Sequence, residues 1–535
     1  MPKKIQTDNK SADKAPRRVE LRVALLLGLI LLLCYSYYFY MGGNWNIETR
    51  LALTHAIVDD GTLMIDRYEA RTGDKAFYKG HYYCDKAVGA SFLGVPVYWA
   101  VRPLLARYGA TGTWVAGNYI ISFFTTAIPS AMLGVLFYLL LGAFVAAAKP
   151  RIWLTLAYGL GTIAFPYATM FFGHQTAAAF AFIAFYLLFR ARHRKWSGGG
   201  VFFAGLLAGY ALITDYLSVA VILGLVVYAV VTVLQVKLPA SPNKLAGRTS
   251  KPPAGSKPVG GGAIPPAGFR PPAGFKPAGG SRMIISLWPF FIGIILPLPL
   301  QLWYNWACFD NAFASAYKYE ALPQFARGMS VGLMGITFPK LEALYQLTFG
   351  PRRGLFYGSP FLLFALPGAW LLMRRLKSKA ARSATRAQSE ISKFRLEGSI
   401  CAGVGLLTLL LNAGYYLWWG GEIYGPRFLL PALPFIALLA LPALYRAPKA
   451  FKLLAVTSIV FTSVVVITIP FISEASPNPL FDGAFRSLIR NGLDLRPNFT
   501  FNAMSLFGLD DIRSVLPLAA IIAICLKYLA SLKAP

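Results

Sequence analysis

The sequence of 535 residues has little charge, few acidic residues and few cysteines. Charged residues make up 14% of it, whereas 56% are apolar. Soluble globular proteins carry about a quarter charged residues, so a soluble enzyme and a disordered chain are both excluded. Five cysteines are too few for a disulfide scaffold.

The shortage of acidic residues leaves a strong positive balance, with 52 Lys and Arg against 22 Asp and Glu, a net charge of +30. Such an excess could point to nucleic acid as a partner. Here, however, the basic residues form short blocks between long apolar runs, which is how polytopic membrane proteins mark their cytoplasmic loops. We therefore expect membrane lipids, and no nucleic acid, around this chain.

The apolar runs predict an all-α polytopic membrane protein. An uncleaved first span at 23–40 follows a basic N-terminus, because no small-residue cleavage site is present. Runs near 20 residues long predict further spans at about 114–146, 151–168, 175–191, 200–214, 217–236, 283–306, 355–373, 398–416, 428–445, 452–471 and 514–531. The total is about twelve.

Basic loops support one orientation of these spans, with the N-terminus in the cytoplasm of a cell inner or plasma membrane. This requires Ala90–Arg107, which contains Arg102 and Arg107, to be a helix lying on the outer leaflet rather than a span. Four regions follow: a basic cytoplasmic N-terminus at 1–22, a first module at 23–236 with a large outer loop at 42–113, a Pro/Gly-rich cytoplasmic linker at 237–281, and a second module at 282–535.

The predicted spans lack ionisable residues at their centres, which argues against an ion-coupled pump or symporter. A P-loop is also missing, since the GGG at 198–200 has no following lysine and Ser/Thr. Polar residues gather in the outer loops 42–113, 307–354, 417–427 and 472–513. We therefore expect an active surface that faces outward.

Several residues of these loops are candidates for chemistry. Glu48 opens an amphipathic helix in which Leu51, Ala52, His55, Ile57 and Val58 can face the bilayer. Its carboxylate could be a base or only a favourable charge at a helix N-terminus. Lys86, beside Asp85, could neutralise a phosphate at headgroup height or simply snorkel.

Arg427 follows two interfacial tryptophans at 418–419 and could bind a phosphate bidentately, or could also snorkel. His174 and Asp215 lie in short outer turns, and each could line the same pocket or finish a helix. Asp59 and Asp60 form an acidic pair that could hold a divalent metal, although one pair does not supply enough ligands for a site. No other cofactor is indicated.

At these residues the sequence resembles the GT-C superfamily of membrane glycosyltransferases, which includes lipid A aminoarabinose transferase and protein O-mannosyltransferases. The family has an acidic residue after the first span, often as Asp-Glu-x-Arg-Tyr-Ala, and here the segment is Ile47-Glu48-Thr49-Arg50-Leu51-Ala52. A (Glu/Asp)-Lys-Pro-Pro-like motif corresponds to Asp85-Lys86-Ala87-Val88, and an Arg-Tyr-x-x-Pro-x-x-Pro segment to Arg427-Phe428 and the following residues up to Pro434. Ile47 stands where the family's catalytic Asp is expected, and Ala-Val replaces Pro-Pro.

The resemblance implies two membrane-surface helices in the first outer loop and a transferase that uses a polyprenyl-phosphate sugar. Glu48 would deprotonate an acceptor hydroxyl on a lipid, glycan or protein, with inversion at the anomeric carbon. Arg50, Asp85, Lys86, His174, Asp215 and Arg427 would bind the substrates, with the cations stabilising the departing phosphate. The alternative is a flippase or transporter of a lipid-linked sugar or glycan.

Overall fold

The computed structural model describes residues 14–39, 42–193, 197–237, 287–374, 392–468, 471, 473–493 and 500–532. These residues form an all-α protein with one two-stranded sheet, which confirms the predicted fold class. Most of the predicted linker at 237–281 and much of the basic N-terminus lie outside the described residues.

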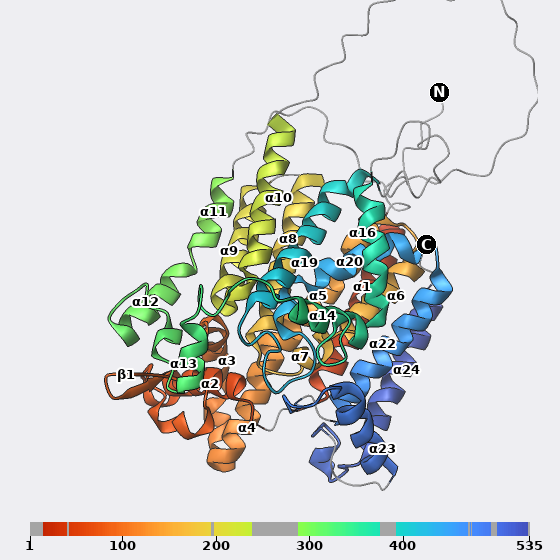
Figure 1. Cartoon of the computed structure of the whole chain (residues 1–535). Helices are drawn as coiled ribbons and strands as arrows, with labels where there is room; N and C mark the ends of the chain where they lie inside the picture. Colours follow the sequence, from red (N-terminus) through yellow and green to blue (C-terminus); the bar gives the residue numbers. More distant parts are fainter. Residues whose placement is uncertain are drawn as a thin grey trace, which may run out of the picture.

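Helices make up the body of the molecule, and several of them run along its length (Figure 1). In chain order these include α1 (Lys14–Ser36), α5 (Ile128–Phe144), α6 (Ala148–Leu160), α7 (Ala164–Ala168), α8 (Gly173–His193), α9 (Gly198–Thr214), α10 (Val219–Lys237), α11 (Trp288–Ile295), α12 (Leu298–Phe309), α16 (Ala365–Met373), α19 (Arg395–Gly414), α20 (Leu433–Leu439), α21 (Leu441–Leu444), α22 (Pro448–Thr468) and α24 (Leu516–Ser531). Their apolar composition makes this a multi-pass membrane protein.

Eight helices of the described residues are long and apolar enough to cross a membrane. They are Arg18–Ser36, Gly89–Phe144, Tyr216–Gln235, Trp288–Phe309, Arg395–Gly414, Arg427–Leu444, Pro448–Thr468 and Ile512–Ser531. The other four of the twelve predicted spans are also helical, but none of them is a single helix that is long and apolar enough to cross a membrane by the same measure. Those at 200–214 and 355–373 correspond to shorter apolar helices, the one at 151–168 is divided between α6 and α7, and α8 covers the one at 175–191.

The first loop and several shorter elements gather at the end of the molecule opposite the C-terminal end of α10, which we call the hairpin end (Figure 1). It carries α2 (Trp45–His55), the antiparallel hairpin of β1 (Ala76–Tyr78) and β2 (His81–Tyr83), α3 (Gly89–Leu105), α4 (Gly109–Ser122), α13 (Pro323–Met329) and α23 (Arg486–Leu493). The predicted surface helix 90–107 corresponds to α3, which continues through α4 to α5.

One prediction for this loop is wrong. Of the residues expected to face the bilayer, those of α2 are buried inside the protein, since Leu51 and Ala52 are fully buried and His55 is 2% exposed, whereas Ile57 and Val58, which follow α2, are half-buried. Helix α2 packs against α3, and nearly all of its side chains are enclosed. An amphipathic pattern does not distinguish a lipid-facing stripe from one that packs on protein.

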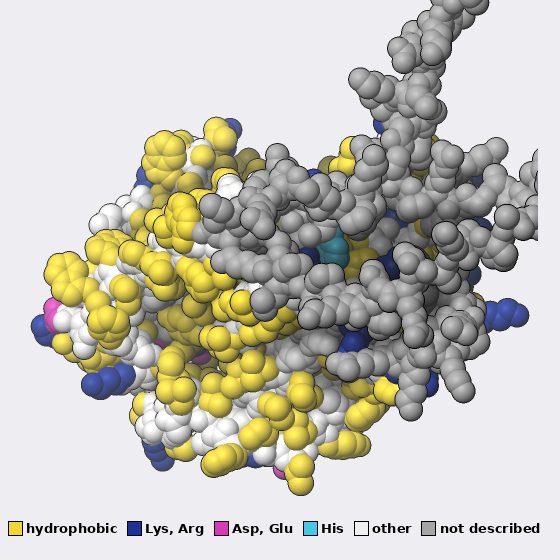
Figure 2. Space-filling model, turned by 90° about the horizontal axis from the view of Figure 1, so that it is seen from above, with side chains coloured by type: hydrophobic (Ala, Val, Ile, Leu, Met, Phe, Trp, Pro, Cys, Tyr) yellow, Lys and Arg dark blue, Asp and Glu magenta, His cyan; other side chains and the backbone are white. Residues whose placement is uncertain are grey.

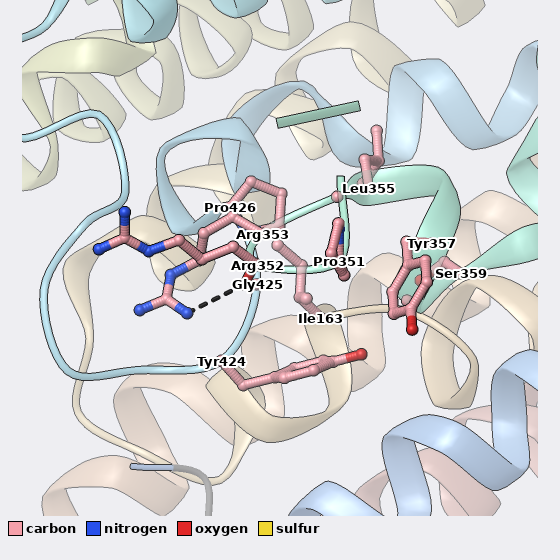
Figure 3. Close-up of a pocket in the computed structure, with 12 residues that line it drawn as sticks. Ile163, Pro351, Arg352, Arg353, Leu355, Tyr357, Ser359, Tyr424, Gly425 and Pro426 are labelled. Carbon is pink, nitrogen blue, oxygen red and sulfur yellow. Dashed lines mark hydrogen bonds between the residues drawn. The ribbon is translucent and has the colours of Figure 1, made fainter. Parts of the chain in front are cut away.

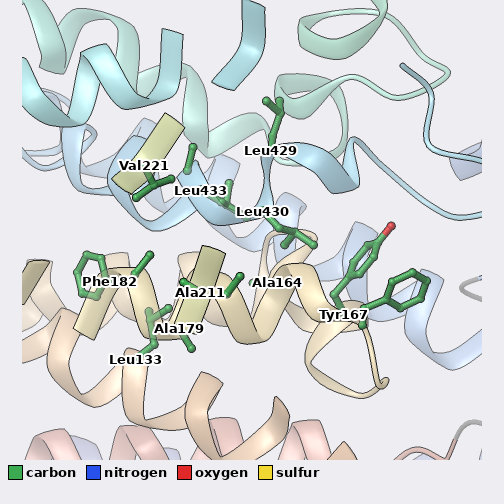
Figure 4. Packing of buried hydrophobic residues seen from close by; sticks show 14 of the residues in the cluster. Leu133, Ala164, Tyr167, Ala179, Phe182, Ala211, Val221, Leu429, Leu430 and Leu433 are labelled. Atoms are coloured by element: carbon green, nitrogen blue, oxygen red, sulfur yellow. The ribbon is translucent and has the colours of Figure 1, made fainter. Parts of the chain in front are cut away.

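The main apolar core joins the two predicted modules. Leu429, Leu430 and Leu433 lie over Ala179 and Phe182 of α8 (Figure 4). Seen from the end opposite the hairpin end, hydrophobic side chains cover much of the visible rim, with Lys and Arg side chains among them (Figure 2). The segment that begins at Arg427 is thus held by core packing on α8.

Candidate active site

Arg50 ties α2 to the predicted phosphate-binding segment. Asn44 caps α2 by accepting a hydrogen bond from the backbone N–H of Asn46 at 3.1 Å. One turn later, Arg50 donates from Nε to Asn46 Oδ1 at 3.3 Å and from Nη1 to the carbonyl of Ala87 at 2.7 Å. These two hydrogen bonds fix the guanidinium next to the Asp85-Lys86-Ala87 segment, and Arg50 is 3% exposed.

Two glycines let three segments meet at the end of α9. A Cβ on Gly89 would lie 2.4 Å from Thr214 Oγ1, and one on Gly173 would lie 2.5 Å from the Thr214 carbonyl and 3.2 Å from Arg50 Cζ. Any larger residue would push α3 or α8 away from α9. These contacts bring the starts of α3 and α8 together with Asp215, which directly follows α9.

His174 and Asp215 form a buried pair at this meeting point. Asp215 Oδ2 lies 2.8 Å from His174 Nδ1, and Asp215 Oδ1 accepts a hydrogen bond from the backbone N–H of Leu217 at 3.2 Å. Their side chains are each 6% exposed. The other ring nitrogen, His174 Nε2, is buried without a hydrogen-bond partner among the described residues. The carboxylate thus orients the imidazole and leaves Nε2 available to a ligand.

Arg427 is a buried cation that has no anionic partner among the described residues. Its guanidinium lies over the rings of Phe172, at 5.8 Å, and Phe428, at 4.9 Å. Nε is buried and unpartnered, and within the described residues the side chain makes no hydrogen bond and no ion pair. Burying a charge without compensation is costly, so this arrangement favours an anionic ligand. Its neighbour His174 supplies the second unpartnered nitrogen.

Two further arginines lie in the turn Pro351-Arg352-Arg353-Gly354 (Figure 3), and Arg353 is close enough to Arg427 to interact with it electrostatically. Arg353 is 1% exposed and donates to three backbone carbonyls, those of Trp419, Arg352 and Gly421, at 2.8–3.0 Å. Burial, aided by the nearby Arg352 and Arg427, lowers the pKa of Arg353 to about 10. It remains charged at neutral pH and adds to the positive potential around Arg427.

Lys86 has a different environment, because carboxylates already surround it. Its Nζ lies 3.0 Å from Asp74 Oδ2 and also contacts Asp85 Oδ2. Burial opposes the charge on Lys86, but Asp74 and Asp85 outweigh it and hold the lysine pKa well above its ordinary value. Lys86 is therefore a compensated charge, and Arg427 is better placed to hold a phosphate.

The carboxyl group of Glu320, from a loop distant in the sequence, lies near Lys86 and Asp85. Glu320 follows η6 (Ala316–Tyr319), forms an isolated antiparallel bridge with Ala76 of β1, and its side chain lies within hydrogen-bonding reach of Asp85. The ring of Tyr317, from the same loop, lies 5.5 Å from Lys86 Nζ. We call Asp74, Asp85, Lys86, Tyr317 and Glu320 the Lys86 cluster.

Sequence analysis missed Asp74, Glu320, Arg352 and Arg353. A signal for the arginines was present: they lie in predicted outer loop 307–354, where the positive-inside pattern makes basic residues unusual. No comparable signal marked Glu320, because its role depends on a bridge formed across more than two hundred residues of sequence.

Glu48 lies apart from both groups of charges. It is 2% exposed; Oε2 accepts a hydrogen bond from Trp114 Nε1 at 3.1 Å and Oε1 accepts one from the Gly43 N–H at 3.3 Å. Two residues of an α-helix are separated by about 200°, so Glu48 projects from the face of α2 opposite that of Asn46 and Arg50. The six predicted binding residues are neighbours, whereas the predicted base is directed elsewhere.

Asp59 and Asp60 are occupied by protein donors. Asp59 contacts Arg102 Nε, His55 Nδ1 at 3.1 Å and Tyr98 Oη, and Asp60 pairs with Arg67 at 2.8 Å. The described residues contain no group of three His, Cys, Asp or Glu side chains arranged to hold a metal ion. Asp59 therefore connects π-helix η1 (Ala56–Asp60) to α3, and Asp60 connects it to 3₁₀-helix η2 (Asp66–Arg71).

The Lys86 cluster and Arg427 share neighbours. Tyr415 packs its ring 5.3 Å from that of Phe428, next to Arg427, and it is also close enough to Lys86 and Tyr317 to interact with both electrostatically. Arg50 likewise lies near His174 on one side and Tyr317 on the other. An anion site and a carboxyl-rich site thus adjoin one another, which suits a reaction with a leaving anion and a transferred proton.

Two solved structures match most of this chain. They are crystal structures of ArnT from Cupriavidus metallidurans, one in the apo state and one bound to undecaprenyl phosphate. The matches have TM-scores of 0.45 and 0.44 at 14% sequence identity, and cover 95% of this chain and 75% and 76% of the other. No protein-family model and no curated protein matches the sequence.

Proposed function

We propose that this protein is a glycosyltransferase that moves a sugar from a polyprenyl-phosphate donor to an acceptor hydroxyl, with inversion, at the outer face of the membrane. The observation that carries the proposal is Arg427, a buried guanidinium with no anionic partner among the described residues, beside the unpartnered Nε2 of His174. A phosphate on a lipid tail satisfies such a group, and a planar guanidinium can bind it bidentately.

Arg427 and the nearby Arg50 and Arg353 would stabilise the charge that develops on the phosphate as its bond to the sugar breaks. Their burial makes this interaction stronger than it would be in water. His174, oriented by Asp215, would donate to or accept from the same headgroup. The apolar tail would lie in the bilayer beside the membrane-spanning helices, and the sugar would reach toward the Lys86 cluster.

The acceptor proton needs a base, and two carboxyl groups of the first loop are candidates. Glu48 is the candidate that the sequence resemblance supplies. Asp85 is the one that adjoins Arg50 and Lys86. The acceptor itself, whether a lipid, a glycan or a protein, has to be identified by experiment.

Transfer can be tested with purified protein in lipid, given radiolabelled polyprenyl-phosphate sugars and a membrane glycolipid extract. We expect label to move to an acceptor with wild type and not with Arg427→Met. Arg107→Ala, which removes an exposed arginine of 3₁₀-helix η3 (Ala106–Tyr108), is the matched control and should transfer normally. Binding and movement of the carrier across the bilayer without any transfer would instead establish a flippase.

A further inference from the structure

The Lys86 cluster holds more acid than base. Three carboxyl groups, those of Asp74, Asp85 and Glu320, surround the single ammonium of Lys86. Three carboxyl groups gathered around one ammonium in a largely buried site cannot all be ionised, so at least one of them keeps a proton.

Burial and the neighbouring charges decide which carboxyl group keeps that proton. The Asp85 side chain is fully buried, and Glu320 Oε2 is buried without a hydrogen-bond partner among the described residues. Burial raises the pKa of both carboxyl groups. At Asp85 this effect is opposed by Lys86 and by the hydrogen bond with Glu320, whereas at Glu320 the neighbouring Asp85 adds to it and raises the pKa to about 10. Glu320 is thus the group that keeps the proton, and Asp85 is the anion beside it.

Asp85 is held in a fixed position but is not saturated by donors. Lys86 contacts Oδ2 and the Glu320 side chain lies within hydrogen-bonding reach, whereas the hydroxyl of Thr49 reaches Oδ1 only at 3.5 Å, the limit of a hydrogen bond. The cluster opens to the surface at the side chains of Lys86 and Asp74, which are 12% and 13% exposed. The Asp85 side chain is itself fully buried, so an acceptor hydroxyl would have to pass the partly exposed Lys86 and Asp74 to reach its carboxylate.

On this geometry, and resting on the proposed transferase function, we propose that Asp85 is the proton acceptor of the reaction and that Glu320, in its protonated form, is the residue that positions Asp85 and keeps it an anion. Glu48 then has the structural role of holding Trp114 and Gly43.

The step is balanced without any further reactant. The acceptor oxygen forms a bond to the anomeric carbon, and its proton passes to Asp85. The bond between that carbon and the phosphate oxygen breaks, and its electron pair leaves with the polyprenyl phosphate held by Arg427. Release of the proton from Asp85 to water returns the pair to its starting state.

The first test compares Asp85→Asn with wild type in the transfer assay. General-base catalysis is worth about 10²- to 10⁴-fold, so the rate at saturating donor should fall at least about 100-fold, with carrier affinity little changed. Asp310→Asn is the matched control, because Asp310 lies in the same loop as Glu320 but pairs with Lys79 at the surface, and asparagine tolerates its positive φ of 57°. An Asp85→Asn protein that keeps full activity would overturn the proposal.

The second test separates positioning by Glu320 from a merely structural role. Glu320→Gln keeps a hydrogen-bond donor toward Asp85 but cannot ionise. In wild type, ionisation of Glu320 should make the rate fall at alkaline pH. Glu320→Gln should have the same rate as wild type at neutral pH and should not show this fall. Glu320→Ala should be slow at every pH. Identical pH–rate profiles for wild type and Glu320→Gln would contradict the role of Glu320.

Infrared difference spectra between wild type and Glu320→Gln detect the protonated carboxyl group and do not require the enzyme to turn over. We expect the band of one protonated carboxyl group at neutral pH in wild type and its loss in the variant. A wild type that transfers no sugar would refute the proposed function, while the infrared band still decides whether Glu320 is protonated. An active wild type beside an equally active Asp85→Asn would refute only this inference.

Discussion

Replacing Arg427 by methionine should weaken carrier binding without weakening the fold. The guanidinium is 9% exposed and lies on two aromatic rings, and no carboxylate of the described residues pairs with it. A hydrogen bond to a charged group contributes about 1.5–3 kcal/mol. Its loss should raise the Kd for polyprenyl phosphate about 10- to 150-fold.

The effect on stability should have the opposite sign to that of breaking an ion pair. Methionine fills similar space without a charge that must be desolvated, so the empty protein should melt at the same temperature as wild type or higher. Arg427→Lys keeps the charge but not the planar fork, and should lie between the two in affinity.

The assay is a titration of protein in nanodiscs with polyprenyl phosphate, with uncharged polyprenol and inorganic phosphate as separate ligands. The expected loss of affinity is confined to the phosphate-bearing lipid, and free phosphate should bind far more weakly because it lacks the tail. Equal affinity of wild type and Arg427→Met for the phosphate lipid, or a large fall in melting temperature of the empty variant, would refute the reasoning.

Three further results are expected in thermal melts. Lys86→Ala leaves Asp74 and Asp85 uncompensated and should cost about 3–5 kcal/mol of stability; a melting temperature equal to wild type would exclude a buried ion-pair role. Gly89→Ala places a Cβ 2.4 Å from Thr214 Oγ1 and should cost about 1–3 kcal/mol, whereas Gly403→Ala, in an open position of α19, should stabilise the protein slightly. Burial alone would raise the pKa of Asp59, but hydrogen bonds from His55 and Arg102 outweigh it and lower this pKa to about 2. An unfolded Asp titrates at about pH 4, so its stabilisation is complete above that pH and is lost as the pH falls toward about 2; Asp59→Asn should remove this part of the acid dependence, and an unchanged slope would contradict the assignment.

The fold class followed from the sequence because membrane-spanning helices are marked by length and hydropathy alone. These signals do not record how a helix is interrupted. Apolar composition runs through 151–168, yet the chain leaves the helix between Leu160 and Ala164, and the span is divided. The same limit explains α2, whose apolar side chains pack on protein rather than on lipid.

The candidate site followed from the sequence in part. Arg50, Lys86 and Arg427 stand in recognisable local motifs, and their gathering with His174 and Asp215 is a consequence of close helix packing at Gly89 and Gly173. Pairings between distant segments leave no local pattern. Glu320 reaches Asp85 only because its loop bridges β1, and Arg353 reaches the vicinity of Arg427 only because it donates to carbonyls of the loop before it.

The central claim is that the chain breaks the bond between a sugar and a lipid phosphate and joins that sugar to a hydroxyl. The most direct measurement follows both products from one labelled donor, the released polyprenyl phosphate and the glycosylated acceptor. We predict that wild type forms them in equal amounts and that Arg427→Met forms neither at a comparable rate. Donor that is bound or carried across the bilayer while its sugar stays attached would contradict the account.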